Sequence, residues 1–495
     1  MRRLAAAAAA ALVLAAPAGA VDWPRFGGDA QLTNDVPTTR PGVIAAAVAP
    51  RLERRWTAAL DGAIVASPLY ADGVVVGGSA RGVVYAATMA GSVYAVSALG
   101  GTVLWQRQLG TVDTGCEQEE PGVASTFGVV STGVIDRARN RLYVIGATGL
   151  VYALDLSTGE TAPGWPVRIV ADTGAEVVWG GLTLAGNRLY VPVASYCDQP
   201  GADGSLANGR LVAVDVDAAA IAATFDVVPG AGDFGGIWGF GGASVDPLSG
   251  HLWTATGNSW VYDPGCGCIV ETAGYAESVV ELDPDLHVVA SSRPQGIPSV
   301  EGDTDFGSTP LLFQPPGCPR LAAAQSKSGF LYVWRRDALG AGPIWSAFIG
   351  PADLDHPFVG EPSWSPELDM LYVADARGYD AQGAIVHFDA VDAFAVGPGC
   401  SFPDTPTWTT PDIGAGPKAP PLVSGDVLFV VGAEVPALYA LDAATGALLW
   451  STSFPGSVFA PPAFAGDEVV AGDTSGDLAA FGIGYGPLAR HFAPP

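Results

Sequence analysis

The chain has 495 residues, of which 49% are hydrophobic and only 15% charged, so a solvated, disordered chain is excluded. The length fits several domains or one large all-β domain. A formal net charge of −27 excludes nucleic acid and anionic lipid as expected partners, because phosphate binding needs a basic surface. The 65 glycines and 40 prolines interrupt every long helical pattern and predict short strands and turns.

The first twenty residues, MRRLAAAAAAALVLAAPAGA, have the three parts of a secretory signal. Two arginines supply positive charge, an apolar stretch follows, and an A-x-A cleavage site ends at Ala20. The apolar stretch is too short to span a bilayer comfortably. No cysteine follows the cleavage site to carry a lipid anchor. We therefore predict residues 1–20 as a signal peptide and a periplasmic or secreted mature chain with no membrane anchor.

One pattern recurs along the chain. Its clearest copy, LYALDAATGALLW at Leu438–Trp450, is an apolar strand ending in Asp, a Thr-Gly turn, and a second strand ending in Trp. The equivalent second residues of eight copies are Tyr94, Tyr152, Val212, Val280, Tyr332, Val386, Tyr439 and Ala479. Their spacings, between 40 and 68 residues, are typical of propeller blades. Each unit is a small meander that needs stacked neighbours to bury both of its faces.

The last copy, which begins at Leu478, lacks its Trp strand, whereas RRWTAAL at Arg54–Leu60 is a Trp strand with no preceding copy. We therefore predict that the N-terminal strand completes the last blade and closes the ring, which leaves no open sheet edge. The expected fold is all-β, an eight-bladed β-propeller of four-stranded antiparallel blades, with residues 21–495 in a single domain.

The pattern YALD-x-x-TG-x-x-x-W resembles the tryptophan-docking repeat of quinoprotein dehydrogenases, eight-bladed propellers that bind pyrroloquinoline quinone (PQQ). DWPRFGGDAQLTN, residues 22–34, also resembles the entry segment of PQQ-like propellers. The same repeat builds non-catalytic propellers, including the outer-membrane assembly lipoprotein. The repeat therefore leaves two functions open, and individual positions must distinguish them.

Three polar residues follow the family's order. Asn258 in VDPLSGHLWTATGNSW resembles the family's Ca²⁺-binding Asn, and an amide oxygen suits this hard ion. Asp305 in DTDFGSTP resembles the catalytic Asp, and Lys327 in AAAQSKSGFLYVWRR resembles the Lys that hydrogen-bonds the quinone oxygens and that Asp. The competing interpretation is structural, because Asn and Asp are common turn residues and Lys is usually solvated.

GGIWGFGGASVDP resembles the segment that supplies the aromatic floor beneath the cofactor. Counting back from Asp246 favours Phe240, whereas the larger π face favours Trp238, to which we give a slight preference. The Glu that usually completes the Ca²⁺ site has no clear match. Asp198 or Asp203 offers a replacement oxygen ligand, and a degenerate site is the alternative.

Six cysteines are present: Cys116, Cys197, Cys266, Cys268, Cys318 and Cys400. An even number in an oxidising compartment predicts three disulfides, and the sequence leaves all 15 pairings open. The chain lacks the adjacent cysteine pair that covers the cofactor in many family members. For Cys266 and Cys268 we expect a structural role, with a lid over the cofactor as the alternative.

The resemblance implies an exported alcohol dehydrogenase that depends on PQQ and Ca²⁺ and transfers hydride from a small-molecule or polymeric alcohol to PQQ. Asp305 would accept the hydroxyl proton, Asn258 would hold Ca²⁺, and Lys327 would stabilise the reduced oxygen. The chain contains no C-x-x-C-H haem motif, so a separate cytochrome-type electron acceptor is expected. The alternative is a non-catalytic propeller that acts as an extracytoplasmic scaffold or binding module.

Overall fold

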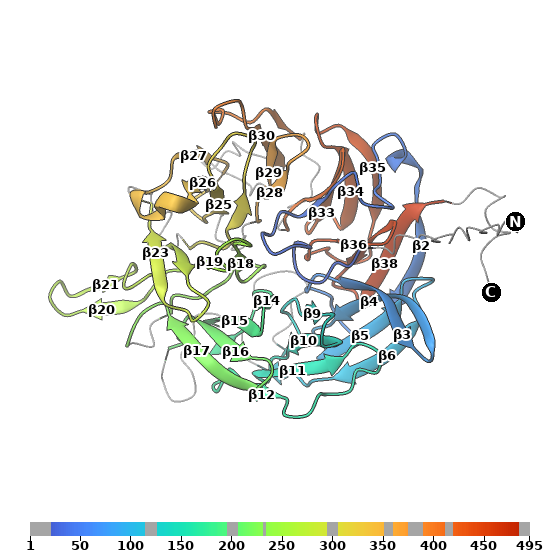
Figure 1. The fold of residues 1–495 in the computed structure, drawn as a ribbon, viewed down its shortest axis with the longest axis horizontal. Coiled ribbons are helices and arrows are strands. Elements are labelled where there is room, and N and C mark those ends of the chain that lie inside the picture. The colour runs from blue at the N-terminus through green and yellow to red at the C-terminus, as the bar shows by residue number, and fades with distance from the viewer. Residues whose placement is uncertain are drawn as a thin grey trace, which may run out of the picture.

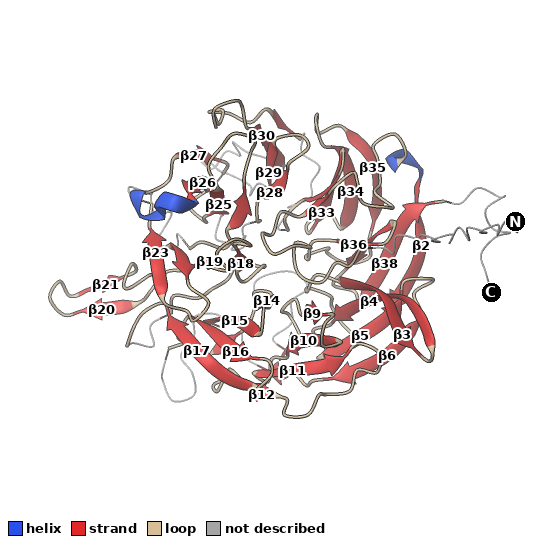
Figure 2. Ribbon diagram, in the orientation of Figure 1, coloured by secondary structure: helices blue, strands red, loops and turns tan. Residues whose placement is uncertain are grey.

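Strands provide almost all of the regular structure (Figure 2). The computed structural model describes residues 21–113, 126–195, 206–230, 234–294, 305–350, 360–374, 390–410 and 419–484. Within these ranges the helical structure consists of two short 3-10 segments, η1 (Ala49–Arg51) and η2 (Arg336–Ala341). No helix of the described residues is long and apolar enough to cross a membrane.

In the described residues, eight sheets of at least four strands surround a common centre, which confirms the predicted eight-bladed propeller (Figure 1). The first strand of each blade lies innermost, and most of the neighbouring first strands contact each other around the ring. The strands of the first four blades are β3 (Leu69–Val76), β4 (Ser79–Ala87), β5 (Ser92–Ser97) and β6 (Val103–Gln108); β9 (Val134–Asp136), β10 (Arg141–Ile145), β11 (Leu150–Asp155) and β12 (Val167–Arg168); β14 (Thr183–Ala185), β15 (Arg188–Ser195), β16 (Arg210–Asp215) and β17 (Ala220–Asp226); and β18 (Ser244–Val245), β19 (Leu252–Ala255), β22 (Val279–Leu282) and β23 (Val288–Ser292).

The second half of the ring repeats this meander. The strands of blades 5 to 8 are β24 (Leu311–Phe313), β25 (Leu321–Gln325), β26 (Phe330–Arg335) and β27 (Trp345–Phe348); β28 (Ser363–Ser365), β29 (Met370–Ala374), β30 (Val391–Ala395) and β31 (Trp408–Thr409); β32 (Leu422–Ser424), β33 (Val427–Gly432), β34 (Ala437–Asp442) and β35 (Leu448–Ser453); and β36 (Ala463–Ala465), β37 (Glu468–Gly472), β38 (Asp477–Ile483) and β2 (Leu52–Ala59). Shorter pairings are β1 (Asp35–Val36) on β32, β13 (Glu176–Val177) on β15, β7 (Val112–Asp113) with β8 (Thr126–Phe127), and β20 (Val261–Asp263) with β21 (Cys268–Val270).

The ring closes as the sequence predicted. The N-terminal strand β2 pairs antiparallel with β38, from Leu52 opposite Ile483 to Ala59 opposite Asp477. This pairing supplies the fourth strand that the last repeat lacks, so the two ends of the described chain hold each other in blade 8.

The Thr-Gly turn of the repeat serves as the docking site for the Trp of the preceding blade. A Cβ atom at Gly159 would lie 2.7 Å from the ring of Trp105, and a Cβ at Gly446 would lie 2.7 Å from the ring of Trp408. Both glycines also have positive φ, +68° and +72°. Only Gly meets both demands, which explains why the turn and the Trp occur together in the sequence.

The repeat positions fall in the third strand of each blade with one exception. In blade 6 the third strand is β30, which starts at Val391, whereas the sequence pattern placed the repeat strand around Val386. Val386 lies outside the described residues. The segment IVHFDAVDAF contains two similar apolar stretches, and the pattern selected the first of them.

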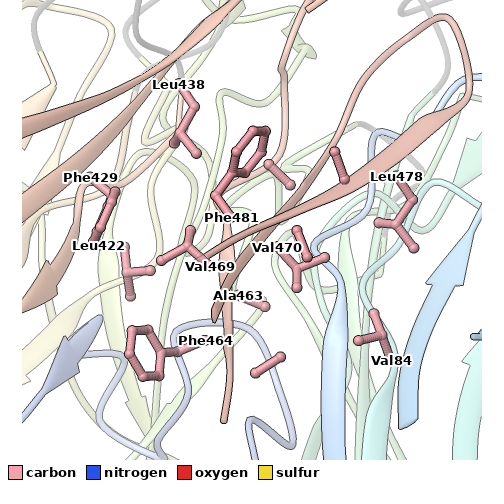
Figure 3. Packing of buried hydrophobic residues seen from close by; sticks show 14 of the residues in the cluster. Val84, Leu422, Phe429, Leu438, Ala463, Phe464, Val469, Val470, Leu478 and Phe481 are labelled. Atoms are coloured by element: carbon pink, nitrogen blue, oxygen red, sulfur yellow. The ribbon is translucent and has the colours of Figure 1, made fainter. Parts of the chain in front are cut away.

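Hydrophobic side chains fill the spaces between neighbouring blades. Figure 3 shows a cluster that fills two neighbouring spaces, with Phe429 of blade 7, Val470 of blade 8 and Val84 of blade 1. Phe429 and Val470 have no exposed surface, and Val84 is 1% exposed. Each fully buried side chain of this kind stabilises the fold by about 1.5–3 kcal/mol.

The N-terminal segment crosses the hub and contacts successive blades. The backbone of Trp23 exchanges hydrogen bonds with that of Tyr70 in blade 1, and the guanidinium of Arg25 donates to Oγ1 of Thr183 in blade 3. The segment ends in β1, which pairs with β32 of blade 7. Further backbone hydrogen bonds join residues 24–34 to the innermost strands β9, β18, β24, β28 and β32. The segment therefore fills the centre of the propeller with chain.

Two disulfides lie in the described residues, and they differ in what they connect. Cys318, in the β24–β25 loop of blade 5, is 6% exposed and bonds to Cys400 in blade 6, 82 residues away. Cys266 bonds to Cys268, two residues away. Cys116 and Cys197 lie outside the described residues.

Replacing both Cys318 and Cys400 with Ala is expected to lower the free energy of unfolding by about 2–4 kcal/mol. The long loop between them makes the unfolded chain much less restricted without the bond. Thermal or denaturant unfolding of the variant would measure the loss. The matched control replaces Cys266 and Cys268 with Ala, which removes a disulfide that closes a far shorter loop, so this variant should lose much less stability. An equal loss in both variants would contradict the prediction.

Candidate functional site

Four of the predicted site residues come from blades 4 and 5. Trp238 lies six residues before β18 and Asp305 six residues before β24, while Asn258 follows β19 and Lys327 follows β25. The first and second strands of each blade run antiparallel, so the residues before the first and after the second lie at the same end. The fold thus brings all four residues to one end of the hub.

Asp305 is the centre of this group. Its side chain is buried, 4% exposed, and its Oδ2 lies 3.0 Å from Nζ of Lys327. The backbone N–H of Lys327 donates to the carbonyl oxygen of Asp305 at 2.8 Å. The backbone N–H of Asn258 donates to Oδ1 of Asp305. Three residues from two blades are therefore joined through one carboxylate.

Trp238 lies near the same carboxylate, on the other side of Gly257. A Cβ atom at Gly257 would lie 2.7 Å from Oδ1 of Asp305 and 3.0 Å from Nε1 of Trp238. A Cβ at Gly236 would lie 2.6 Å from the same indole nitrogen. Two glycines thus leave room for the indole beside the carboxylate. Trp238, like Asn258 and Lys327, is only partly buried.

Phe240, the other candidate for the aromatic floor, lies in the hydrophobic hub. Its ring stacks on Phe26 of the N-terminal segment at 6.3 Å between centroids and packs edge-on against Phe459 at 5.8 Å. Trp179 contacts it from a third direction. Trp238 packs against the same hydrophobic cluster and also lies near Asp305, whereas Phe240 is buried within the cluster.

Glu361, which the sequence interpretation missed, connects three blades behind this group. Its Oε1 accepts the backbone N–H groups of Gly241 at 2.9 Å and Thr309 at 3.0 Å, so it joins the segments that carry Trp238 and Asp305. It is 1% exposed, and among the described residues its Oε2 has no hydrogen-bond partner. Burial raises the pKa of Glu361 to about 7, and the two N–H donors only partly oppose this shift. The signal in the sequence was a single acid two residues before β28.

The metal-binding capacity of this group rests on few donors. The described residues contain no group of three or more His, Cys, Asp or Glu that could hold a metal ion. Asp305 and the side-chain amide of Asn258 offer oxygen, the donor that Ca²⁺ takes. Asp198 and Asp203 lie outside the described residues. Asp198 is three residues beyond the end of β15, which ends at the same end of its blade as β19 and β25.

The hairpin that carries Cys266 and Cys268 does not lie over this group. Strands β20 and β21 project outward from the rim of the propeller, away from the hub (Figure 1). This disulfide therefore does not form a lid over the polar group, which was the alternative considered from the sequence.

The fold and this group of side chains define a closed eight-bladed β-propeller with a polar cluster at one end of a filled hub. A family model described as outer membrane protein assembly factor BamB matches residues 36–114, 89–222 and 395–487, more than half of the chain. The chain belongs to the PQQ-type β-propeller family. No curated protein sequence matches it.

Three solved structures illustrate the range of similar proteins. The quinohemoprotein alcohol dehydrogenase from Comamonas testosteroni has a TM-score of 0.70 at 17% identity, over 94% of this chain and 82% of that one. A europium-containing methanol dehydrogenase has a TM-score of 0.70 at 13% identity, over 93% and 98%. BamB from Moraxella catarrhalis has a TM-score of 0.55 at 14% identity, over 87% and 99%. At these identities the likeness shows the fold.

Proposed function

We propose that this chain is an exported PQQ-dependent oxidoreductase that oxidises an alcohol. The observation that carries the proposal is the Asp305–Lys327 ion pair, 3.0 Å long, beside the partly exposed Trp238. A propeller that serves only as a scaffold has no need for a buried carboxylate, an ammonium group and an indole at one end of its hub. The fold likeness to alcohol and methanol dehydrogenases is consistent with this choice.

The chemistry of these side chains fits PQQ, a flat ring system with quinone oxygens. Trp238 offers a large π face, and Lys327 offers a cationic donor. When bound, PQQ would supply the acceptor for the two electrons that leave the alcohol. We propose Asn258 and Asp305, with Asp198, as the oxygen donors for Ca²⁺.

Asp305 is the residue proposed to take the proton of the alcohol hydroxyl group. Among the described residues, Oδ1 of Asp305 accepts the backbone N–H of Asn258 and Oδ2 accepts Nζ of Lys327. The two bonds fix the direction of the carboxylate, which a general base needs. Lys327 balances its charge and would stabilise negative charge on a nearby oxygen.

The direct test is to add PQQ and Ca²⁺ to the purified mature protein with a series of alcohols and a dye acceptor. We expect uptake of one PQQ per chain and dye reduction that depends on the alcohol. A chain that neither binds PQQ nor reduces the dye would reject the proposal. A basic cytochrome-type protein is the proposed natural acceptor, because it would be attracted to the chain's net charge of −27.

Replacing Trp238 with Ala is expected to weaken PQQ binding about tenfold, because the loss of one aromatic stacking contact costs about 1.4 kcal/mol. Phe240→Leu is the matched variant, since it alters the other aromatic candidate and keeps the hub apolar. Titration of each folded variant with PQQ measures the two affinities. If only the Phe240 variant binds PQQ more weakly, Phe240 and not Trp238 is the residue on which the cofactor stacks.

The second candidate function is a non-catalytic scaffold or binding module outside the cytoplasm. It is favoured by the family model described as BamB and by the absence, among the described residues, of three grouped metal-ligating side chains. Affinity capture from the compartment of export tests it. Stoichiometric PQQ binding without any captured partner would reject the scaffold.

A further inference from the structure

The hairpin β20–β21 carries an exposed disulfide far from the hub. Cys266 and Cys268 are both exposed, separated by one glycine, and bonded to each other at the tip of the hairpin. The hairpin projects from the rim beside blade 4 (Figure 1), and Tyr262 on β20 is 63% exposed. Both cysteines therefore lie on a surface that a second protein can approach.

This disulfide adds little to the fold. The turn is already closed, because Gly267 N–H donates to the carbonyl oxygen of Asp263 at 2.8 Å and Gly265 N–H donates to its Oδ1 at 2.7 Å. A bond between residues two apart restricts the unfolded chain far less than the 82-residue link from Cys318 to Cys400. The hairpin base is held independently, since Ser259 Oγ donates to the carbonyl of Val270 at 3.0 Å.

We propose that Cys266 and Cys268 form a thiol–disulfide exchange site that accepts electrons from a dithiol protein. A thiolate of the partner attacks one of the two sulfurs, a new S–S bond forms, and the Cys266–Cys268 bond breaks with its electron pair going to the other sulfur, which takes up a proton. The partner's second thiolate then attacks the mixed disulfide. The partner leaves as a disulfide, and this chain is left with two thiols.

Asp263 is positioned to set the rate of this exchange. It lies directly opposite Cys268 in the hairpin register. Directly opposite residues of an antiparallel pair have Cβ atoms about 5 Å apart. A carboxylate at that position repels an approaching thiolate and disfavours a leaving thiolate on the same sulfur. The site therefore favours a partner whose thiol lies among basic groups.

The experiment treats the folded, full-length mature protein with a limiting amount of reduced thioredoxin-type dithiol protein, followed by alkylation and peptide mass spectrometry. We expect Cys266 and Cys268 to be reduced at least about tenfold faster than Cys318 and Cys400, with an unchanged melting temperature. Oxidised probe should restore the bond. A probe that lacks its resolving cysteine should form a mixed disulfide with the native chain and none with the Cys266→Ser/Cys268→Ser variant.

Asp263→Asn gives an independent measurement, because Asn keeps the acceptor for Gly265 N–H and removes the charge. We expect reduction to become several-fold faster. Reduction of both disulfides at the same rate, or a fall in melting temperature when only Cys266 and Cys268 are reduced, would overturn the proposal in favour of a structural role. The absence of any mixed disulfide would overturn it as well.

Discussion

Replacing Asp305 with Asn is expected to lower turnover of alcohol by about a thousandfold while PQQ affinity changes by less than about tenfold, in line with the usual contribution of a general base. The amide keeps nearly the same shape, and its oxygen can still accept the backbone N–H of Asn258. It cannot take up a proton at neutral pH. Steady-state turnover and PQQ titration of the same preparation separate the two effects.

The matched control for this substitution is Asp473→Asn in blade 8. Asp473 lies in a similar stretch, GDTSGD, and is fully buried. It accepts the backbone N–H groups of Ser475 and Asp477 within its own turn and that of Gly456 in the loop between β35 and β36. The control should alter stability and leave turnover unchanged. If Asp305→Asn retains turnover, the base is another residue and Asp305 is only a link between blades.

Replacing Glu361 with Ala is expected to lower the free energy of unfolding by about 2–4 kcal/mol. The change orphans the buried N–H group of Thr309, at about 1–3 kcal/mol, and it leaves a cavity, while the N–H of Gly241 keeps Oγ1 of Thr309 as its acceptor. Glu361→Gln keeps the shape and one acceptor oxygen for both donors. The Gln variant should therefore remain close to the native stability at low pH.

The pH dependence distinguishes these two variants further. Burial raises the pKa of Glu361 from its ordinary 4.5 to about 7, so the folded chain holds a proton that the unfolded chain has lost between these values. The contribution of Glu361 to the free energy of unfolding is therefore greatest below about pH 4.5. It falls by up to about 3 kcal/mol as the pH rises to 7.

The measurement compares the native chain with Glu361→Gln from pH 4.5 to 8. The pKa values of Asp35 and Glu468 are also raised to about 7 by burial, so both chains lose stability in this window. The difference between the chains isolates Glu361, and the Gln variant should gain relative to the native chain as the pH rises. A constant difference would show that Glu361 does not titrate in this range.

The order of the blades could be predicted from the sequence because each copy of the repeat carries its apolar strand, its turn and its Trp within one short stretch. The Trp and the Gly of successive copies depend on each other, because the indole of Trp105 packs on Gly159 of the next blade, where a side chain would clash with it. The closing strand followed from counting, because Leu478 begins a copy with no Trp strand and Arg54 begins a Trp strand with no copy. Both features are written within short stretches of chain.

The position of the third strand in blade 6 could not be predicted in the same way. Two apolar stretches of similar pattern lie side by side there, and only the pairing of β29 with β30 selects Val391–Ala395. The register of a strand depends on its neighbours, which a local pattern does not contain.

The sequence by itself determined the all-β propeller, its number of blades and its ring closure, because each of these depends on a local repeat of apolar strand, turn and Trp. Only the tertiary structure decided that Asp305, Lys327, Asn258 and Trp238 meet at one end of the hub. It also chose Trp238 over Phe240 as the neighbour of the carboxylate and placed Glu361 behind both segments. Most of these relations join residues of neighbouring blades, and no stretch of sequence records a distance between blades.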